Sequence, residues 1–310
     1  MAGLHGGVAS NVVKTALDKV FNAEFDYPVL PGVATAEDSI VFIQDATDRA
    51  SVITEQFQGS GYWDTRTELQ DVPEGSNKVG NQKTFAVLNY SKSLDVSKNL
   101  FDDDQHSVVQ MMLRNMARNA RLTRDKNAIS IFANAFGTTD TNDGVDLISA
   151  SHITLDGTTV SNDVTGALSD AWIESAIISL IEQKTQDGTL GGHEPACLLV
   201  PPALFKEANI FTKSELRPST ANNDLNYVSY IYPGLVVKQS PFLGTAHGGN
   251  DAYAFLLSRN HSIFRWLRQA LQTDLVDYKY QRNNNYIYKG EYREVVGAIS
   301  FEGLVGTDGA

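Results

Sequence analysis

The side chains that most often carry metal or acid–base chemistry are few and scattered in this chain. Its six histidines stand at positions 5, 106, 152, 193, 247 and 261, which is too far apart for the close spacing of metal ligands. His152 could serve as a ligand or a base, although a hydrogen-bonded structural role is the simpler interpretation. The sequence also contains no GxGxxG, GxxxxGKS/T, GxSxG or HExxH motif. We therefore predict no catalytic constellation, no metal and no cofactor, and we expect that the protein is not an enzyme.

Two other features have structural interpretations that we prefer. Cys197 is the single cysteine and lies in the apolar run Ala-Cys-Leu-Leu-Val, which predicts a small buried side chain and excludes an intrachain disulfide. Residues 140–144 resemble the start of a calcium loop, but the glycine arrives one position early and the distal glutamate is missing. We predict a polar turn there.

A stripe of basic residues on a predicted helix is open to more than one interpretation. Arg114, Arg118 and Arg121 recur at helical spacing, with Arg124 one turn further along. They could contact nucleic acid, pair with carboxylates of a neighbouring subunit, or simply face solvent.

The helices that must position these residues are marked by apolar stripes. The longest predicted helix spans residues 102–136 and is opened by three aspartates, which suit the N-terminal end of a helix. Its expected apolar stripe consists of Val109, Met112, Leu113, Met116 and Ala120. A second helix follows a possible cap at Ser169, carries a regular apolar stripe over residues 172–181 and is stopped at 187–188. A short helix is predicted at 11–21, and another at 201–208 after two prolines.

The predicted strands are short or alternating. Residues 51–57 and 86–96 have strand character, residues 196–200 form an apolar run typical of a buried strand, and residues 276–280 and 286–292 alternate as a hairpin. Between the first two strands, residues 59–83 form a glycine-containing polar run with little from which to build a core. Because loops of this length are uncommon in compact domains, we interpret this run as a candidate projecting arm.

Composition indicates a folded globular protein of 310 residues, with 42% hydrophobic and 20% charged residues. The formal net charge of -12 argues against tight nonspecific wrapping of DNA. The first twenty residues lack a signal-peptide pattern, and no apolar run approaches the roughly 18 residues that a membrane span needs. We expect synthesis in the cytoplasm and no membrane contact, and we find no internal repeat.

The order of these elements and several residue runs carry a resemblance to a known family. The runs are LFDDD at 100–104, RD at 124–125, NAF at 134–136, DGVDLISASH at 143–152, PACLLVPPAL at 195–204 and YIYKGEYREVVG at 286–297. By the order and spacing of these runs, the chain resembles the major capsid proteins of tailed double-stranded DNA bacteriophages, which have the Hong Kong 97-type α+β fold. The chain departs from the family at the N-terminus, where we expect no long coiled-coil scaffolding segment before the arm; if scaffolding is needed, another protein would supply it.

The resemblance implies an organisation along the chain. It consists of an N-terminal arm over residues 1–50, an extended loop over 51–84, a peripheral domain over 85–164 with a spine helix at 102–136, an axial domain over 165–270, and return strands of the peripheral domain over 271–310.

The resemblance also implies a function as a structural head protein that self-assembles into pentamers and hexamers of an icosahedral shell. The shell would enclose double-stranded DNA, contacted loosely, in the virion capsid. Scaffolding, portal and decoration proteins are further candidate partners. Candidate contacts between subunits are Tyr62, Trp63, Arg66, Glu68, Glu74 and Lys78, while Arg114, Arg118 and Arg121 would face DNA or a neighbouring subunit.

Two alternatives and one chemical question remain open from the sequence. An encapsulin-like nanocompartment shell around an enzyme cargo shares the fold, and a hydrolase with an unrecognised site would need converging titratable groups. Some capsids of this fold cross-link through a loop lysine, and Lys78 and Lys83 lie in the predicted loop. We predict no cross-link, because no asparagine partner and catalytic carboxylate are marked.

Overall fold

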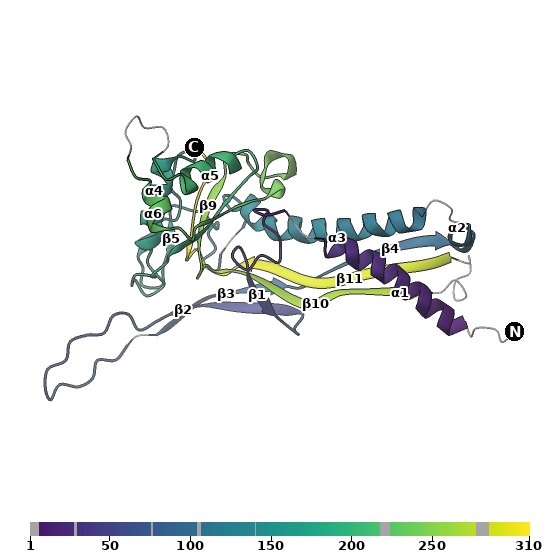
Figure 1. Ribbon diagram of the computed structural model, residues 1–310. Helices are drawn as coiled ribbons and strands as arrows, with labels where there is room; N and C mark the ends of the chain where they lie inside the picture. Colours follow the sequence, from purple (N-terminus) through teal and green to yellow (C-terminus); the bar gives the residue numbers. More distant parts are fainter. Residues whose placement is uncertain are drawn as a thin grey trace.

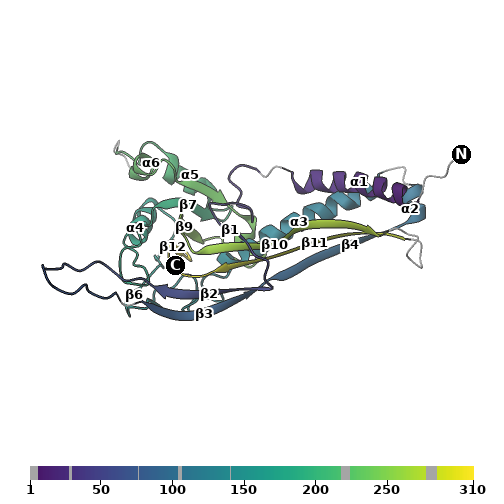
Figure 2. The same cartoon turned by 90° about the horizontal axis from the view of Figure 1, so that it is seen from below.

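A computed structural model describes residues 6–27, 30–75, 77–103, 107–139, 141–217, 224–276 and 285–310. The molecule has three parts, which Figure 1 shows side by side. We call them the body, a long sheet with two long helices; the head, a compact sheet with three helices; and the hairpin, strands β2 (Ser51–Gln58) and β3 (Lys78–Ala86). The hairpin projects past the head, and the N-terminal helix lies at the opposite end of the molecule (Figures 1 and 2).

The body is built on a four-stranded sheet with the order β1-β10-β11-β4. Its strands are β1 (Ile43–Ala46), β10 (Ile263–Val276), β11 (Asn285–Ala298) and β4 (Leu88–Ser97). β1 is parallel to β10, and the other pairs are antiparallel. The register between β11 and β4 runs unbroken from Asn285↔Ser97 to Glu294↔Leu88, whereas β10 and β11 shift register twice.

Helices α1 (Gly6–Phe25) and α3 (Val108–Ala133) pack against this sheet and against each other. Their apolar cluster includes Phe21 from α1, Leu113 from α3 and Tyr288 from β11. Asp18 fixes α1 further, because its Oδ1 accepts hydrogen bonds from the hydroxyls of Tyr288 (2.6 Å) and Thr273 (2.8 Å). The N-terminal segment is therefore a docked helix, longer than the predicted 11–21.

The head is built on a second four-stranded sheet with the order β12-β9-β7-β8. Its elements are β7 (Pro195–Val200), β8 (Val236–Gln239), β9 (Ala254–Ser258), β12 (Leu304–Thr307), α4 (Asp170–Ile181), α5 (Phe205–Lys213), α6 (Tyr227–Ile231) and the 3-10 turns η1 (Pro241–Leu243) and η2 (Thr245–His247). Every residue of β7 and β9 is buried, as their continuous apolar runs require. Ser169 caps α4 by accepting from the Trp172 amide (3.1 Å), as predicted.

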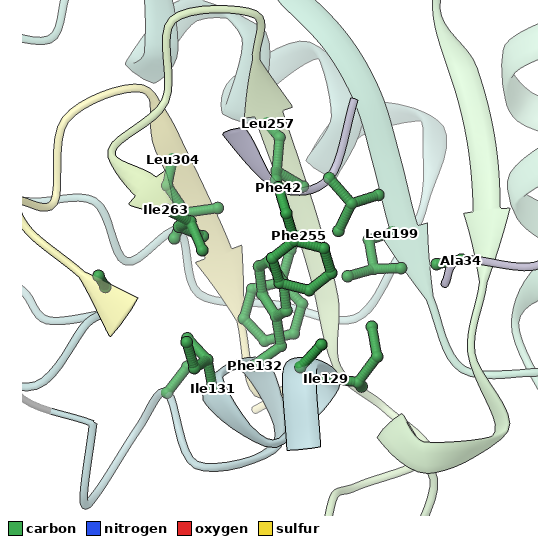
Figure 3. Packing of buried hydrophobic residues seen from close by; sticks show 14 of the residues in the cluster. Ala34, Phe42, Ile129, Ile131, Phe132, Leu199, Phe255, Leu257, Ile263 and Leu304 are labelled. Carbon is green, nitrogen blue, oxygen red and sulfur yellow. The ribbon is translucent and has the colours of Figure 1, made fainter. Parts of the chain in front are cut away.

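The largest core cluster lies where body and head meet (Figure 3). Phe132 of α3 stands between Phe42 of the N-terminal segment (5.9 Å between ring centroids) and Phe255 of β9 (5.3 Å). All three rings are fully buried. Leu199, Ile263 and Leu304 bring β7, β10 and β12 into the same cluster. This junction therefore joins segments from the whole length of the chain into one rigid unit.

The spine helix begins later than the sequence predicts. Lys98–Asp102 forms a separate short helix, α2, whose cap Ser97 accepts from the Leu100 amide (3.2 Å). Ser107 then has a φ of 55°, in the left-handed region, so a single helix cannot run through it. The aspartates at 102 and 103 consequently end α2 instead of opening α3, and residue 104 lies outside the described residues. Met112, predicted on the apolar stripe, is exposed.

Two further boundaries differ from the prediction. The two prolines at 201 and 202 stand in a turn before α5, which runs over Phe205–Lys213 instead of ending at 208. α4 ends at Ile181, six residues before the predicted stop, because Gln183 is buried and its side-chain oxygen accepts from the Gly303 backbone amide (2.7 Å). Strand β11 confirms the second half of the predicted C-terminal hairpin, while residues 277–284 lie outside the described residues.

Sheet membership divides the chain differently from the boundary predicted at residue 270. β10 belongs to the body from Ile263 onward, and β12 at the C-terminus pairs with β9 in the head. The last segment is thus shared between the two sheets. The terms axial and peripheral describe positions in a shell and stay predictions. No described helix is long and apolar enough to cross a membrane.

Candidate assembly surface

The predicted projecting arm is a two-stranded hairpin with an irregular tip. We call the tip the described residues between its two strands, 59–75 and 77. β2 (Ser51–Gln58) pairs antiparallel with β3 (Lys78–Ala86), from Ser51↔Ala86 at the base to Gln58↔Lys78. The irregular part is shorter than the predicted 59–83, because β3 begins at Lys78. The predicted strand at 86–96 is β4, which pairs with β11 in the body. The tip extends well beyond the head in both views (Figures 1 and 2).

The tip carries apolar side chains that its own subunit leaves uncovered. Trp63 is 95% exposed and Leu69 is 96% exposed, and Tyr62 and Val72 are also largely exposed. Leu69 moreover has a φ of 67°, a left-handed conformation that costs a leucine about 1–2 kcal/mol. Burying each large apolar side chain would contribute roughly 1.5–3 kcal/mol. A polar tip that exposes four large apolar side chains and holds one of them in a strained conformation is typical of a surface that a partner covers.

All six predicted contact residues, Tyr62, Trp63, Arg66, Glu68, Glu74 and Lys78, are exposed on the tip or at its edge. Their contacts within the subunit are few. The Arg66 Nε donates to the Gln70 carbonyl, which closes a local turn. The Tyr62 hydroxyl accepts from the Leu190 amide of the head (3.1 Å) and marks where the free part of the tip begins.

The base of the hairpin, in contrast, is fixed to the subunit. The Phe85 ring packs on Trp266 of β10 at 5.3 Å between centroids. Gly297 makes this approach possible, because a Cβ at that position would lie 2.4 Å from the Phe85 ring. The side chains of Thr54 and Asn142 are hydrogen-bonded to each other at 3.2 Å. The hairpin is therefore anchored at one end and free at the other.

A short turn occurs three times beside the hairpin, although no internal repeat was predicted. The copies are TNDGV at 141–145, TLDGT at 154–158 and TQDGT at 185–189. In each, the threonine hydroxyl donates to the aspartate and the glycine has a φ between 75° and 90°. The aspartate also accepts from the backbone amide two residues later, at 2.9–3.3 Å. The Thr-x-Asp-Gly pattern was the sequence signal that could have revealed them.

Two of these turns contact each other and the hairpin. A Cβ on Gly188 would lie 2.3 Å from the Asp156 carboxylate, and one on Gly59 would lie 3.0 Å from the Asp187 carboxylate. Hydrogen bonds from Thr154 and Thr185 lower the pKa of Asp156 and Asp187, respectively. The second β-hairpin, β5 (His152–Ile153) with β6 (Thr159–Val160), carries the middle turn. The one stretch that resembled a calcium loop is a polar turn over the described residues 141–145, as predicted.

His152 has the predicted structural role. It is fully buried, its Nδ1 lies 2.7 Å from the Asp143 carboxylate, and its ring stacks on Phe301 at 4.4 Å. Burial alone would raise the pKa of Asp143, but hydrogen bonds from His152 and Thr141 lower it overall. Cys197 is also fully buried, and burial raises the pKa of its thiol far above the usual range. Cys197 is therefore an unreactive thiol in the core.

The predicted basic stripe divides into two environments. Arg114 and Arg118 are exposed, while the Arg121 guanidinium donates to the Tyr27 carbonyl at 2.9 Å. Arg124 is buried, lies over the Phe25 ring and pairs with Glu37 at 2.6 Å. Only the first two residues therefore present an unobstructed basic surface.

A buried ion pair lies behind Arg124. Arg265 of β10 donates from Nε to Glu294 of β11 (2.8 Å) and from Nη1 to the Gln44 amide oxygen of β1 (2.8 Å). Arg265 and Glu294 are 3% and 2% exposed. A charge buried in this way is tolerated only with its partner, so the pair fixes the register of three strands.

The arrangement suits binding between surfaces. Within the described ranges, no group of three or more histidine, cysteine, aspartate or glutamate side chains could hold a metal ion. The largest accessible features are instead the tip with its exposed apolar side chains, the anchored hairpin base and a basic pair on the spine helix.

Comparisons with known proteins agree with this geometry. The family model described as phage capsid protein matches residues 81–306. Among solved structures, the capsid of Myoviridae phage XM1 is 14% identical with a TM-score of 0.53, covering 92% of this chain and 95% of that chain. The capsid of cyanophage P-SCSP1u is 12% identical with a TM-score of 0.56, covering 91% and 90%. The mature capsid of bacteriophage PhiM1 is 13% identical with a TM-score of 0.56, covering 91% and 88%.

No curated protein sequence matches the chain at a significant level. The solved structures share the α+β fold of tailed-phage capsid proteins, at identities that speak for the fold alone. The family match covers most of the chain, including α3, the head sheet up to residue 306, and the body sheet except β1. It favours neither the nanocompartment nor the hydrolase alternative. The chain belongs to the phage capsid protein family, and it is a structural major capsid protein of the virion.

Proposed function

We propose that the protein self-assembles into pentamers and hexamers that form a closed icosahedral shell around double-stranded DNA. It is made in the host cytoplasm, and it acts through contacts between subunits without enzymatic activity. The capsid of the native GTA particle, which has this fold at 10% identity and a TM-score of 0.57, was computed with C5 symmetry. That symmetry supports the pentameric part of the proposal.

One observation carries the proposal: the exposed apolar side chains and the strained residue of the tip, on a hairpin whose base is fixed. Trp63 and Leu69 are almost completely exposed, and ordering the tip costs backbone entropy that its own contacts offset poorly. In the shell the tip lies over a neighbouring subunit, which buries both side chains. Tyr62, Arg66, Glu68, Glu74 and Lys78 surround them with polar contacts, as the edges of protein interfaces usually do.

DNA is held loosely in this proposal. The net charge of -12 opposes tight binding to phosphates, and Arg114 and Arg118 supply only a small exposed basic surface. These two arginines face either the packaged DNA or a neighbouring subunit's carboxylates. Scaffolding, portal and decoration proteins complete the set of proposed partners.

No covalent cross-linking is part of the proposal. Lys78 is exposed at the edge of the tip, and the Lys83 ammonium lies over the Phe85 ring at 5.3 Å from its centroid. Particles boiled in denaturant should therefore run as single subunits on a gel.

The test is the size of the purified protein. Sedimentation at micromolar concentration, followed by electron microscopy, should give capsomers or closed particles far heavier than the 33.9 kDa monomer. Nuclease-protected DNA inside particles isolated from infected cells would support the genome-enclosing role. A protein that stays monomeric in several buffers and salts would contradict the proposal.

A further inference from the structure

A polar pocket lies where the tip-side end of β2 meets the head and body. Its volume is about 400 Å³, and its walls come from β2, from the 185–189 turn and from the segment between β11 and β12. The hairpin contributes Glu55 at the rim, the turn contributes Gln186 and Asp187, and the third wall contributes Glu302. The pocket thus has one wall on the projecting hairpin and two on the rest of the subunit.

The lining is acidic. Among the residues that the structure describes, it holds three carboxylates, Glu55, Asp187 and Glu302, and no lysine, arginine or histidine. Burial raises the pKa of Glu302, and the Asp187 charge raises it further. Glu55 is exposed and its carboxylate accepts from the Gln82 side chain on β3 (2.9 Å), so the two carboxylates that act on each other are Asp187 and Glu302. Two carboxylates beside a small volume repel one another unless a positive group enters.

The pocket also contains buried polar atoms without hydrogen-bond partners. Gln186 is only 7% exposed, yet neither its side-chain nitrogen nor its oxygen reaches hydrogen-bond geometry with a described protein group. Gln186 lies close enough to Glu302 to favour the charged carboxylate, but the Glu302 Oε1 is likewise buried and unpaired. Each unsatisfied buried group costs about 1–3 kcal/mol. A bound ligand would supply the missing partners.

We propose that this pocket binds a small organic cation that carries N–H donors, namely a guanidinium or ammonium group. Such a group donates to the Glu302 and Asp187 carboxylates and to the Gln186 side-chain oxygen, and it brings the missing positive charge. A bare metal ion is a poorer fit, because these carboxylates form no metal-holding group in the described part of the chain. The cation comes from a free polyamine-like molecule or from a basic side chain of a neighbouring copy.

Occupancy would affect the hairpin directly. Gln56 and Gly59 of the hairpin form one wall of the pocket, and Asp187 and Glu302 lie on the rest of the subunit, so a cation held by these two carboxylates fills the space between the two parts. This inference stands apart from the proposed shell, because the pocket is complete within one subunit.

The experiment titrates the full-length protein with agmatine, below the concentration at which it assembles and at constant ionic strength set with KCl. Isothermal titration should show saturable binding, and the melting temperature should rise. Glu302→Gln and Gln186→Leu should each weaken binding about tenfold or more, since each removes a hydrogen-bond partner of the cation. Glu182→Gln is the matched control, because it removes an exposed carboxylate outside this pocket and should bind as the wild type does.

Assembled particles identify the source of the cation. Particles that still bind agmatine have a site for a free cation. Particles that no longer bind it, and that Glu302→Gln destabilises while Glu182→Gln does not, have the site filled by a neighbour's basic side chain. Absence of saturable binding to the unassembled wild type, or equal binding by all four proteins, would overturn the proposal whether or not shells form.

Discussion

The hairpin tip and the junction between body and head hold similar side chains in opposite surroundings. At the junction, Phe42, Phe132 and Phe255 are fully buried against each other. At the tip, Trp63 and Leu69 are almost fully exposed. Both regions are rich in large apolar groups, yet only the first can stabilise the isolated subunit, because free energy is gained only where apolar surface leaves water.

The difference separates folding from assembly. The junction collects residues from the N-terminal segment, the spine helix and both sheets, so it is complete in one chain. The tip is attached through its base and can be completed only by another chain. Substitutions at the junction should therefore alter the free energy of unfolding, and substitutions at the tip should alter the formation of particles.

The largest expected effect on folding comes from emptying the junction. Phe132→Ala should lower the free energy of unfolding by about 3–5 kcal/mol, because it leaves a cavity between two aromatic rings. Urea unfolding of the unassembled protein measures this change. Trp63→Ala removes a larger aromatic side chain from the tip, but that side chain is exposed, so the free energy of unfolding should change by less than about 0.5 kcal/mol. Equal losses in the two variants would show that the comparison is wrong.

The second largest expected effect is a loss of folding stability at low pH, which we attribute to His261. Its Nε2 faces the Ile40 carbonyl (3.2 Å) and its Nδ1 accepts from the Ile263 amide (3.2 Å), so the neutral ring is held. Burial lowers the pKa of His261 to about 4, below its usual value of about 6.5. The unfolded chain therefore gains a proton first as the pH falls from about 6.5 to 4, which costs on the order of 3 kcal/mol of stability.

The check is the slope of unfolding free energy against pH in that window. His261→Gln should flatten the slope, and His247→Gln should leave it unchanged, because His247 is exposed in the head. An unchanged slope in the His261 variant would refute the assignment.

A smaller effect is expected at Cys197. Cys197→Ala removes one buried sulfur atom from β7 and should cost about 1–2 kcal/mol, with particle formation unchanged. Thermal melting and electron microscopy measure the two parts. A folded variant that no longer forms particles would reveal a role in assembly that burial does not explain.

The elements with regular apolar patterns could be predicted from the sequence. α4 has its stripe and its Ser169 cap, and β7 is buried throughout, because a buried face leaves a direct periodic record in the chain. The start of α3 could not be predicted in this way. Aspartates at 102–104 favour the N-terminus of a helix, but Ser97 caps the separate helix α2 before them. The left-handed backbone at Ser107 then prevents a continuous helix into α3.

The candidate surface was only partly predictable for a related reason. A projecting arm followed from the length of the run at 59–83, but the exposure of Trp63 and Leu69 depends on which other segments fail to reach them. The burial of Arg124 likewise depends on Glu37, which is distant in the sequence. The contact roles of the six tip residues stay predictions, because a neighbouring copy is needed to test them.

The most direct test of an assembly role for the tip replaces the tip alone. Residues 63–74 are replaced with a short Gly-Ser turn, which keeps β2, β3 and the Tyr62 contact to the head. Circular dichroism and urea unfolding should match the wild type within about 0.5 kcal/mol, because the tip buries little surface in its own subunit. Electron microscopy and sedimentation should show no closed particles. A folded variant that still builds normal shells would contradict the central claim, and so would a variant that cannot fold.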